Sequence, residues 1–453
     1  MIKTYIVILC LFWTTTSYGQ GNQTILNTAQ MHSDLDILKS ALTSLHPGTY
    51  RYLTKSQLDK YFKEINEQTN RPLLIGEFYL KLSHLTEKLK CGHTYLNPYN
   101  QKKALDAKLQ SSPVIPLLFR VVGKKIIITH NLSENAQIKA GDEIVSINGQ
   151  TSERIIDSLL TVSRSDGNNG LNKKLDNIGI SPYLASKDRY ALFDIYFPLF
   201  FSNGSSSEYY AVGVRPFKNS KAIKYNLLAT SKQSRQNLYQ ERFVAEYMQP
   251  TGSFKLVSPQ CGYLRIRDFT TKGWDKDYDR YLDSIFIKLK TMKTSQLIVD
   301  IRDNEGGDDN VRNKVISYLI NHPAHYTISR YFSFLTVPDS LMPYLQTWDP
   351  TFKKPKPVAN YERTKAGLYY NKTTSSIQII VPNQNYFAGQ VYLLTNATNS
   401  SSSFFMADIL QENKYAKLVG DATGGTKQGI NGGQFFFLYL PSSGIEVDIP
   451  LVY

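Results

Sequence analysis

The sequence predicts an α/β protein assembled from three regions of different texture. From about residue 29 to residue 90, apolar residues recur at spacings of three and four, which is typical of amphipathic helices. Short strand-like segments and turns dominate between residues 113 and 160. Beyond about residue 255, strands and helices alternate, and this alternation favours helices layered on a sheet. At roughly 100–200 residues per domain, the 453 residues predict two or three domains.

The composition is that of a folded chain and excludes several classes of protein. Hydrophobic residues make up 42% and charged residues 20%, which excludes disorder, collagen and a long coiled coil. The net charge is +14, but Lys and Arg are scattered, so no nucleic-acid partner is expected. Three cysteines exclude a disulfide scaffold, and the pairing of Cys91 with Cys261 is left open. No metal-ligand spacing occurs, and we expect neither a metal nor another cofactor.

Residues 1–19 have the layout of a secretory signal peptide. A positive start is followed by an apolar run from Tyr5 to Trp13, which is too short to span a bilayer, and then by a polar exit that ends at Gly19. No later stretch reaches about 18 apolar residues, so no stable membrane insertion is expected. The sequence therefore predicts export to the periplasm, the cell envelope or the extracellular space.

The N-terminal region, residues 20–112, is predicted to be helical and to carry a candidate base. Leucines recur with helical spacing over Leu35–Leu45, and a second helical pattern ends before Gly92. His93 follows directly and is bracketed by Gly92 and Thr94. An imidazole just past a helix end, on a chain that turns, is placed to act as a base, although a lone histidine is more often structural.

The middle region, residues 113–232, is predicted to be rich in strands. Residues 140–149 contain a turn, an alternating strand and an Asn-Gly turn, and helical spacing returns over Ser152–Leu160. The remaining strands are expected over Val114–Phe119, Lys125–Thr129, Tyr209–Val214 and Lys224–Ala229.

Two segments of the third region, residues 233–453, are candidates for chemistry. The apolar run Gln296–Ile301 is typical of a strand buried on both faces, and it leads into Gly306-Gly307, whose backbone N–H groups can approach a substrate. The segment from Val391 to Val419 contains a strand, the serines 400–403, a helix and a second strand. A serine at a helix start lies in a field that favours developing negative charge, although taken singly the two segments are more commonly an ordinary tight turn and a serine helix cap.

Taken together, these segments resemble the tail-specific (C-terminal processing) serine peptidase family, and most closely its tricorn-like branch, which includes interphotoreceptor retinoid-binding protein-like domains. The family's Gly-His-Thr element matches residues 92–94, and residues 138–149 resemble part of a PDZ domain. The strand-and-turn motif Asp-x-Arg-x-Asn-x-Gly-Gly is filled at every position, by Asp300, Arg302, Asn304, Gly306 and Gly307.

The resemblance implies a fold and a site. The fold is a ClpP/crotonase-like α/β core over residues 233–453, with the helical domain before it and a PDZ-like domain and extension over residues 113–232. Alignment on the helix after the serines puts the nucleophile at Ser401, with Ser400 or Ser402 as register alternatives. His93 is the implied base, and the implied oxyanion donors are the N–H groups of Gly306, Gly307 and Ser402.

The acidic or basic partner of this site is left open by the resemblance. The processing-protease branch uses a Ser–Lys dyad, for which Lys427 is the candidate, one residue later than the family spacing. The tricorn-like branch uses Ser and His with a Glu that follows a characteristic strand. The resemblance places that strand at Leu440–Pro450 in this sequence. That Glu lies beyond Tyr453, or Glu446 or Asp448 replaces it, or activity is impaired.

The resemblance therefore implies an exported serine peptidase that hydrolyses peptide bonds, with peptide or protein substrates bound or gated by the PDZ-like domain. The alternative from a different class is a catalytically impaired homologue that binds peptide or lipid. A third alternative is an enoyl-hydratase-like enzyme, because its core fold is related. It is the weakest of the three, because no acyl-carrier phosphate site is evident. The oligomeric state is not predicted.

Overall fold

The computed structural model describes residues 24–102, 105, 113–168, 170–186, 191–201, 208–247, 249–274, 277–327, 330–373 and 377–453. The predicted signal peptide lies outside these residues. Within the described part of the chain, we find no helix with the length and apolar character needed to cross a membrane.

In the described part of the N-terminal region, the structure has three helices, as the leucine spacing predicts. Each of the first two begins at a polar cap: the side chains of Asn27 and Thr54 accept the N–H groups of Gln30 and Gln57, whose own side chains bond back. A short strand pair, β1 (Ile25–Leu26) with β2 (Leu73–Leu74), closes the bundle. The helices are α1 (Thr28–Leu45), α2 (Lys55–Gln68) and α3 (Ile75–Lys88).

An antiparallel sheet with helices around it forms the middle region, which we take as residues 113–247. Asn148 and Gly149 have φ of 49° and 77°, as a tight hairpin turn requires. The strands run in the order β3 (Leu117–Val122), β4 (Lys125–Asn131), β5 (Glu143–Ile147), β7 (Tyr209–Arg215) and β8 (Ile223–Leu228), with β6 (Gln150–Thr151) beside β5. The helices are α5 (Ser152–Leu160), α6 (Leu171–Ile178), α7 (Pro182–Ser186), α8 (Leu192–Phe201), α9 (Lys232–Arg242) and α10 (Val244–Tyr247).

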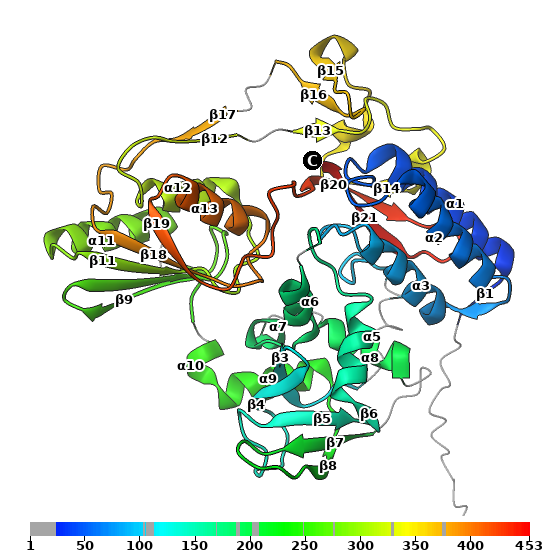
Figure 1. The fold of residues 1–453 in the computed structure, drawn as a ribbon, viewed down its shortest axis with the longest axis horizontal. Helices are drawn as coiled ribbons and strands as arrows, with labels where there is room; N and C mark the ends of the chain where they lie inside the picture. The colour runs from blue at the N-terminus through cyan, green and yellow to red at the C-terminus, as the bar shows by residue number, and fades with distance from the viewer. Residues whose placement is uncertain are drawn as a thin grey trace, which may run out of the picture.

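A five-stranded, mostly parallel sheet forms the α/β core, which confirms the predicted fold class (Figure 1). Its central strand buries Leu297 and Val299 between helices, as its continuous apolar run predicts. The order is β19 (Ala416–Gly420), β18 (Gln390–Thr395), β11 (Gln296–Asp300), β10 (Cys261–Ile266) and β9 (Gly252–Ser258), with only β9 antiparallel. The core helices are α11 (Tyr278–Thr291), α12 (Asp309–Ser317) and α13 (Ser401–Glu412).

An extension of short strands leaves the core after α12 and returns before β18. β12 (Ala324–Thr327) pairs with β17 (Ile377–Ile380), and β16 (Tyr369–Asn371) lies between β13 (Tyr331–Phe332) and β15 (Tyr361–Arg363). Three single-turn helices, η1 (Met342–Tyr344), η2 (Pro350–Lys353) and η3 (Val358–Asn360), complete it.

The last hairpin departs from the prediction. β20 (Gly432–Tyr439) and β21 (Glu446–Val452) form a sheet with β14 (Leu345–Gln346). The single strand predicted over Leu440–Pro450 is wrong, because Gly444, with φ of 70°, makes a turn before β21 begins. Figure 1 shows β20 and β21 (red) beside the N-terminal helices (blue) and away from the five-stranded sheet.

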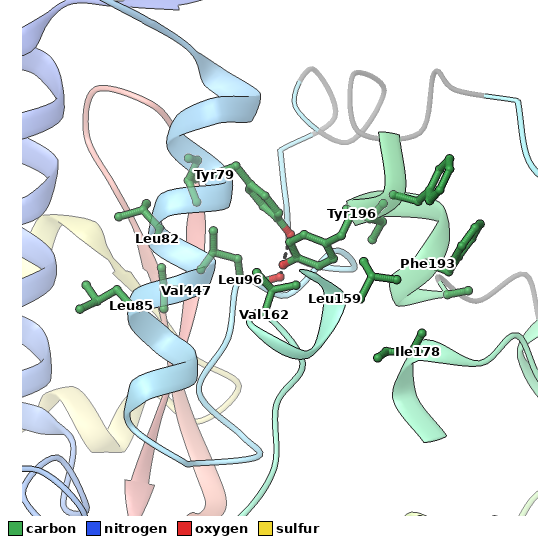
Figure 2. Packing of buried hydrophobic residues seen from close by; sticks show 14 of the residues in the cluster. Tyr79, Leu82, Leu85, Leu96, Leu159, Val162, Ile178, Phe193, Tyr196 and Val447 are labelled. Carbon is green, nitrogen blue, oxygen red and sulfur yellow. Dashed lines mark hydrogen bonds between the residues drawn. The ribbon is translucent and has the colours of Figure 1, made fainter. Parts of the chain in front are cut away.

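Two hydrophobic cores result. One joins the N-terminal helices, the middle region and the last hairpin; the other is the interior of the α/β core. Figure 2 shows the first core running from Tyr79 on α3 to Tyr196 on α8, whose ring centroids are 5.9 Å apart. The turn that carries His93 is thus built on one core and the turn that carries Ser401 on the other.

Candidate active site

The carboxyl end of β11 is anchored by ionic contacts of Asp300. This buried carboxylate accepts the Tyr263 hydroxyl at 2.6 Å, and the guanidinium groups of Arg265 and Arg302 bind it at 3.0 and 2.7 Å. Burial acts to raise the pKa of Asp300, but the hydrogen bonds from Arg302 and Tyr263 outweigh it, and the pKa lies below its ordinary value. Asp300 and Arg302 therefore shape the turn that follows rather than face a substrate.

The glycine turn has a backbone that only glycine adopts readily. Gly306 and Gly307 have φ of 113° and 136°, and a Cβ on Gly307 would lie 2.4 Å from the carbonyl oxygen of Phe269. The Gly306 N–H donates to the side-chain oxygen of Asn304 at 2.8 Å. Of the predicted oxyanion donors, the Gly306 N–H is thus already engaged, whereas those of Gly307 and Ser402 donate no hydrogen bond within the described residues.

The serine turn is bonded directly to the glycine turn. The buried amide of Asn399 donates to the carbonyl oxygens of Ile301 and Asn304 at 2.6 and 3.0 Å. The Ser403 hydroxyl donates to the same Asn304 carbonyl at 2.7 Å. Two turns about 95 residues apart in sequence are held as one unit by these bonds.

Ser401 differs from the three serines around it. Its φ is 50°, a left-handed conformation that is strained for a side chain with a Cβ. Within the described residues its hydroxyl makes no hydrogen bond. The other three hydroxyls are bonded, to Glu305 O (Ser400, 3.3 Å), Asp309 Oδ1 (Ser402, 2.6 Å) and Asn304 O (Ser403). A strained serine with a free hydroxyl at the start of a helix after a strand is the arrangement of an enzyme nucleophile.

Gly306 lies directly against this serine. A Cβ on Gly306 would lie 3.1 Å from Cβ of Ser401 and 2.9 Å from the backbone nitrogen of Ser402. The Ser402 N–H belongs to the first turn of α13, where N–H groups have no acceptor within the helix. It can therefore serve as a donor to an oxyanion that forms next to Ser401.

The His93 ring is held between the last hairpin and the middle region. Its centroid is 5.9 Å from that of Phe435, and a Cβ on Gly432 would lie 3.8 Å from its Cε1. Burial lowers the pKa of His93 below its ordinary value; Asp166 opposes this shift, and Arg164 and Lys173 add to it. The ring Nδ1 is buried without a hydrogen-bond partner, and no hydrogen bond joins the ring to Ser401 within the described residues.

A second histidine supports the Gly-His-Thr turn. His46 Nδ1 accepts the N–H of Gly48 at 3.0 Å, so the ring proton is on Nε2, which lies 2.8 Å from the Thr94 hydroxyl. Burial lowers the pKa of His46 to about 3, which keeps the ring neutral and this tautomer fixed. The end of α1 is thereby tied to the residue that follows His93.

A cavity of about 540 Å³ lies beside the turn that carries His93 and beside the glycine and serine turns. Tyr95 borders it next to His93, and Glu305 and Thr398 border it next to the glycine and serine turns. The Arg164 guanidinium stacks on the Tyr95 ring at 3.7 Å. The middle region supplies much of the apolar wall, including Phe119, Val162, Ile195 and Tyr196. The volume suits a small ligand or a few side chains of a peptide.

The other predicted candidates form their contacts away from Ser401. The ammonium group of Lys427 is largely exposed and pairs with Asp408 at 2.9 Å and Glu412 at 2.5 Å on α13. Glu446 is fully buried on β21, and its carboxyl oxygens receive no hydrogen bond. Burial and the neighbouring Asp448 raise the pKa of Glu446 well above its ordinary value. Neither residue contacts Ser401 or His93.

Sequence reasoning missed three charged residues that act on His93. Asp166, Arg164 and Lys173 come from the start of the segment between α5 and α7. Lys173 is buried and donates to Glu305 Oε1 at 3.2 Å and to the Thr398 carbonyl at 3.1 Å. The Asp-Gly pair at residues 166–167 signals a turn, but nothing in the local pattern indicates a contact with residue 93.

Within the described residues, no three His, Cys, Asp or Glu side chains are grouped so that they could hold a metal ion. Cys91 is buried and Cys261 half-buried, and both are free thiols, which answers the question of their pairing. The amide of Asn431 instead contacts the Cys91 sulfur at 3.3 Å.

Comparisons with known proteins agree with the fold. Residues 260–448 match the family model of Peptidase family S41. A mutant of CPAF has a similar crystal structure, with 12% identity and a TM-score of 0.63 over 94% of this chain and 89% of CPAF. Mature CPAF complexed with lactacystin gives 12% identity and a TM-score of 0.60 over 94% and 90%. At this identity the likeness establishes a shared fold. No curated protein matches the chain.

The family match supports a serine-type peptidase. It confirms the resemblance to the tail-specific serine peptidases over residues 260–448, which carry most of the α/β core and the serine turn.

Proposed function

We propose that the chain is an exported serine peptidase that hydrolyses peptide bonds with Ser401 as nucleophile and His93 as base. The observation that carries this proposal is the state of Ser401: a strained backbone and an unbonded hydroxyl, next to a Ser402 N–H that donates no hydrogen bond within the described residues. The three neighbouring serines are bonded and carry no such signature.

The chemistry follows from the protonation states. Because burial lowers the pKa of His93, the ring is neutral near pH 7 and able to take the Ser401 proton. The serine oxygen then bonds to the peptide carbonyl carbon, and the carbonyl oxygen becomes an oxyanion that accepts the N–H groups of Ser402 and Gly307. His93 returns the proton to the leaving amine as the C–N bond breaks, and a water molecule hydrolyses the acyl-enzyme by the same route.

This route requires His93 and Ser401 to come within hydrogen-bond distance when a substrate binds. Catalytic hydrogen bonds are often long without substrate and tighten in the complex. The two residues stand on separate cores, and the cavity is bordered by sequence neighbours of each, Thr94 and Thr398. A peptide in the cavity would contact both turns and favour their approach.

The middle region and the N-terminal segment complete the proposal. The antiparallel sheet of the middle region has β8 as an edge strand, and such an edge can bind a peptide as an added strand, in the manner of a PDZ domain. The signal-like residues 1–19 support an exported location, where the substrate would be a peptide or protein of that compartment.

The test is labelling with a fluorophosphonate, which reacts with activated serine hydroxyls. The unmodified protein and the Ser400→Ala variant should be labelled, whereas Ser401→Ala and His93→Ala should not. Ser400→Ala is the matched control because it removes a neighbouring hydroxyl bonded only to a backbone carbonyl. Undiminished labelling of Ser401→Ala would reject Ser401 as nucleophile.

A second candidate function is a binding protein for peptide or lipid. It is favoured by the missing hydrogen bond between His93 and Ser401 and by the unpartnered Nδ1. In that case the unmodified protein would show no labelling and no hydrolysis, but would bind a peptide or lipid saturably. Tyr196→Ala, which alters the cavity wall, would then weaken binding.

A further inference from the structure

Asp166 lies directly against the backbone of the residue before His93. Its carboxylate is buried, and Oδ1 accepts the Gly92 N–H at 2.8 Å. A Cβ on Gly92 would lie 2.8 Å from Oδ2 of the same carboxylate. The residue before His93 must therefore be glycine, because the carboxylate occupies the space where any side chain would begin.

The loop that carries Asp166 holds this turn from several directions. Arg164 Nη1 donates to the Gly92 carbonyl at 3.1 Å, and the Gly167 N–H donates to the Lys90 carbonyl at 2.9 Å. Both backbone polar groups of Gly92 are thus bonded to residues 164–166, which follow α5 of the middle region. The position of His93 depends on this loop.

Charged groups around His93 leave Asp166 as the acid suited to support it. Glu305 is bonded to Lys173, and Arg164 and Lys173 are cations. Among the described residues, Asp166 forms no ion pair with Lys or Arg, and its charge acts on the pKa of the ring more strongly than that of Glu305. An imidazolium formed at His93 would therefore find its nearest uncompensated negative charge at Asp166.

We propose that Asp166 is the positioning residue of His93: its carboxylate fixes the turn through the Gly92 N–H and stabilises the imidazolium that forms when His93 takes the Ser401 proton. This inference rests on the proposed function. It assigns the acidic role to a residue 73 positions after the base (166 − 93) and outside the α/β core. The docking of the middle region would then be a condition for catalysis.

The test separates charge from shape. Asp166→Asn keeps the size of the side chain and an oxygen that can accept the Gly92 N–H, but removes the charge. We expect kcat/KM for peptide hydrolysis to fall about tenfold or more, mainly through kcat. Asp157→Asn, which removes an exposed acid of the same region, is the matched control and should leave kcat/KM unchanged. Asp166→Ser gives a second uncharged variant should Asp166→Asn fold poorly.

A readout without turnover makes the test independent of the nucleophile. In Ser401→Ala protein, NMR titration of the His93 ring, assigned by its loss in His93→Gln, should give a lower pKa after Asp166→Asn. An unchanged pKa would overturn the role of Asp166 even if Ser401→Ala abolishes labelling. A lowered pKa would uphold the Asp166–His93 coupling even if labelling persists in Ser401→Ala, an outcome that would overturn only the nucleophile.

Discussion

At the scale of single residues, the site is defined by residues whose backbone conformation is rare for their residue type or for residues in general. Ser401 adopts a left-handed backbone without being glycine, and Gly306 adopts a φ that other residues rarely reach. Strain of this kind persists only where surrounding bonds enforce it, here those of Asn399 and Asn304. The motif residues that are most specific in the sequence thus fix the backbone of the turn, and the position of Ser401, the proposed nucleophile, depends on them.

Gly306→Ala should abolish most activity. The added Cβ would lie 2.9 Å from the Ser402 nitrogen and would crowd the N–H proposed to bind the oxyanion, and φ of 113° adds strain of about 1–3 kcal/mol. Loss of oxyanion stabilisation predicts a fall in kcat of about a hundredfold. Peptide hydrolysis measures the loss of activity, and thermal unfolding measures the strain.

Gly123→Ala provides the control for strain alone. Gly123 has φ of 60° in the turn between β3 and β4, and a Cβ there would have open space around it. This variant should be destabilised by about 1 kcal/mol and keep its activity. Equal activity of the two variants would argue against an oxyanion space at Gly306.

At the scale of elements, the sequence pattern predicts those segments whose structure is locally determined. The helix over Ser152–Leu160 and the strand that begins at Gln296 match, because capping and burial act over a few residues. The last strand was misjudged because its apolar residues begin before the turn at Gly444. The acid beside His93 escaped prediction since only folding brings Asp166 to Gly92.

The strand β21 carries two buried carboxyl groups on one face. Asp448 accepts the amides of Asn97 and Asn100 at 2.8 and 3.1 Å, whereas Glu446 has no donor. Burial raises the pKa of both groups. A group whose pKa is higher in the folded chain stabilises the fold below its unfolded pKa, and this contribution is lost as pH rises through the folded pKa. The pair should therefore reduce stability progressively above about pH 4.5.

Glu446→Gln should stabilise the protein at neutral and alkaline pH. Glutamine resembles the protonated glutamic acid and needs no proton, so the free energy of unfolding should rise by about 1–3 kcal/mol at pH 8 and depend less on pH. Thermal unfolding between pH 5 and pH 9 measures this. Glu67→Gln, an exposed acid on α2, serves as control and should leave the pH profile unaltered. A steeper pH profile in Glu446→Gln would contradict the assignment.

At the scale of the whole molecule, the N-terminal helices and the last hairpin pack together around His93, the proposed base. The hairpin of β20 and β21 packs on α1, and its residues Gly432 and Phe435 contact the His93 ring. This association spans about 400 residues of sequence. No local pattern encodes this association. The sequence therefore predicts the hairpin as part of the α/β region, residues 233–453, whereas its side chains pack in the core shared by the N-terminal helices and the middle region.

One buried acid joins the hairpin turn to the first helix. Asp34 on α1 accepts the N–H groups of Ser442 and Ser443 at 2.8 and 2.9 Å. Asp34→Ala would leave these N–H groups without an acceptor, which costs about 1–3 kcal/mol of unfolding free energy. Since the same hairpin holds the His93 ring, the fluorophosphonate labelling rate should fall as well.

Asp36→Ala, an exposed acid two residues along α1, should change neither the melting temperature nor the labelling rate. A destabilised Asp34→Ala protein that is labelled at the full rate would mean that the hairpin does not position the base.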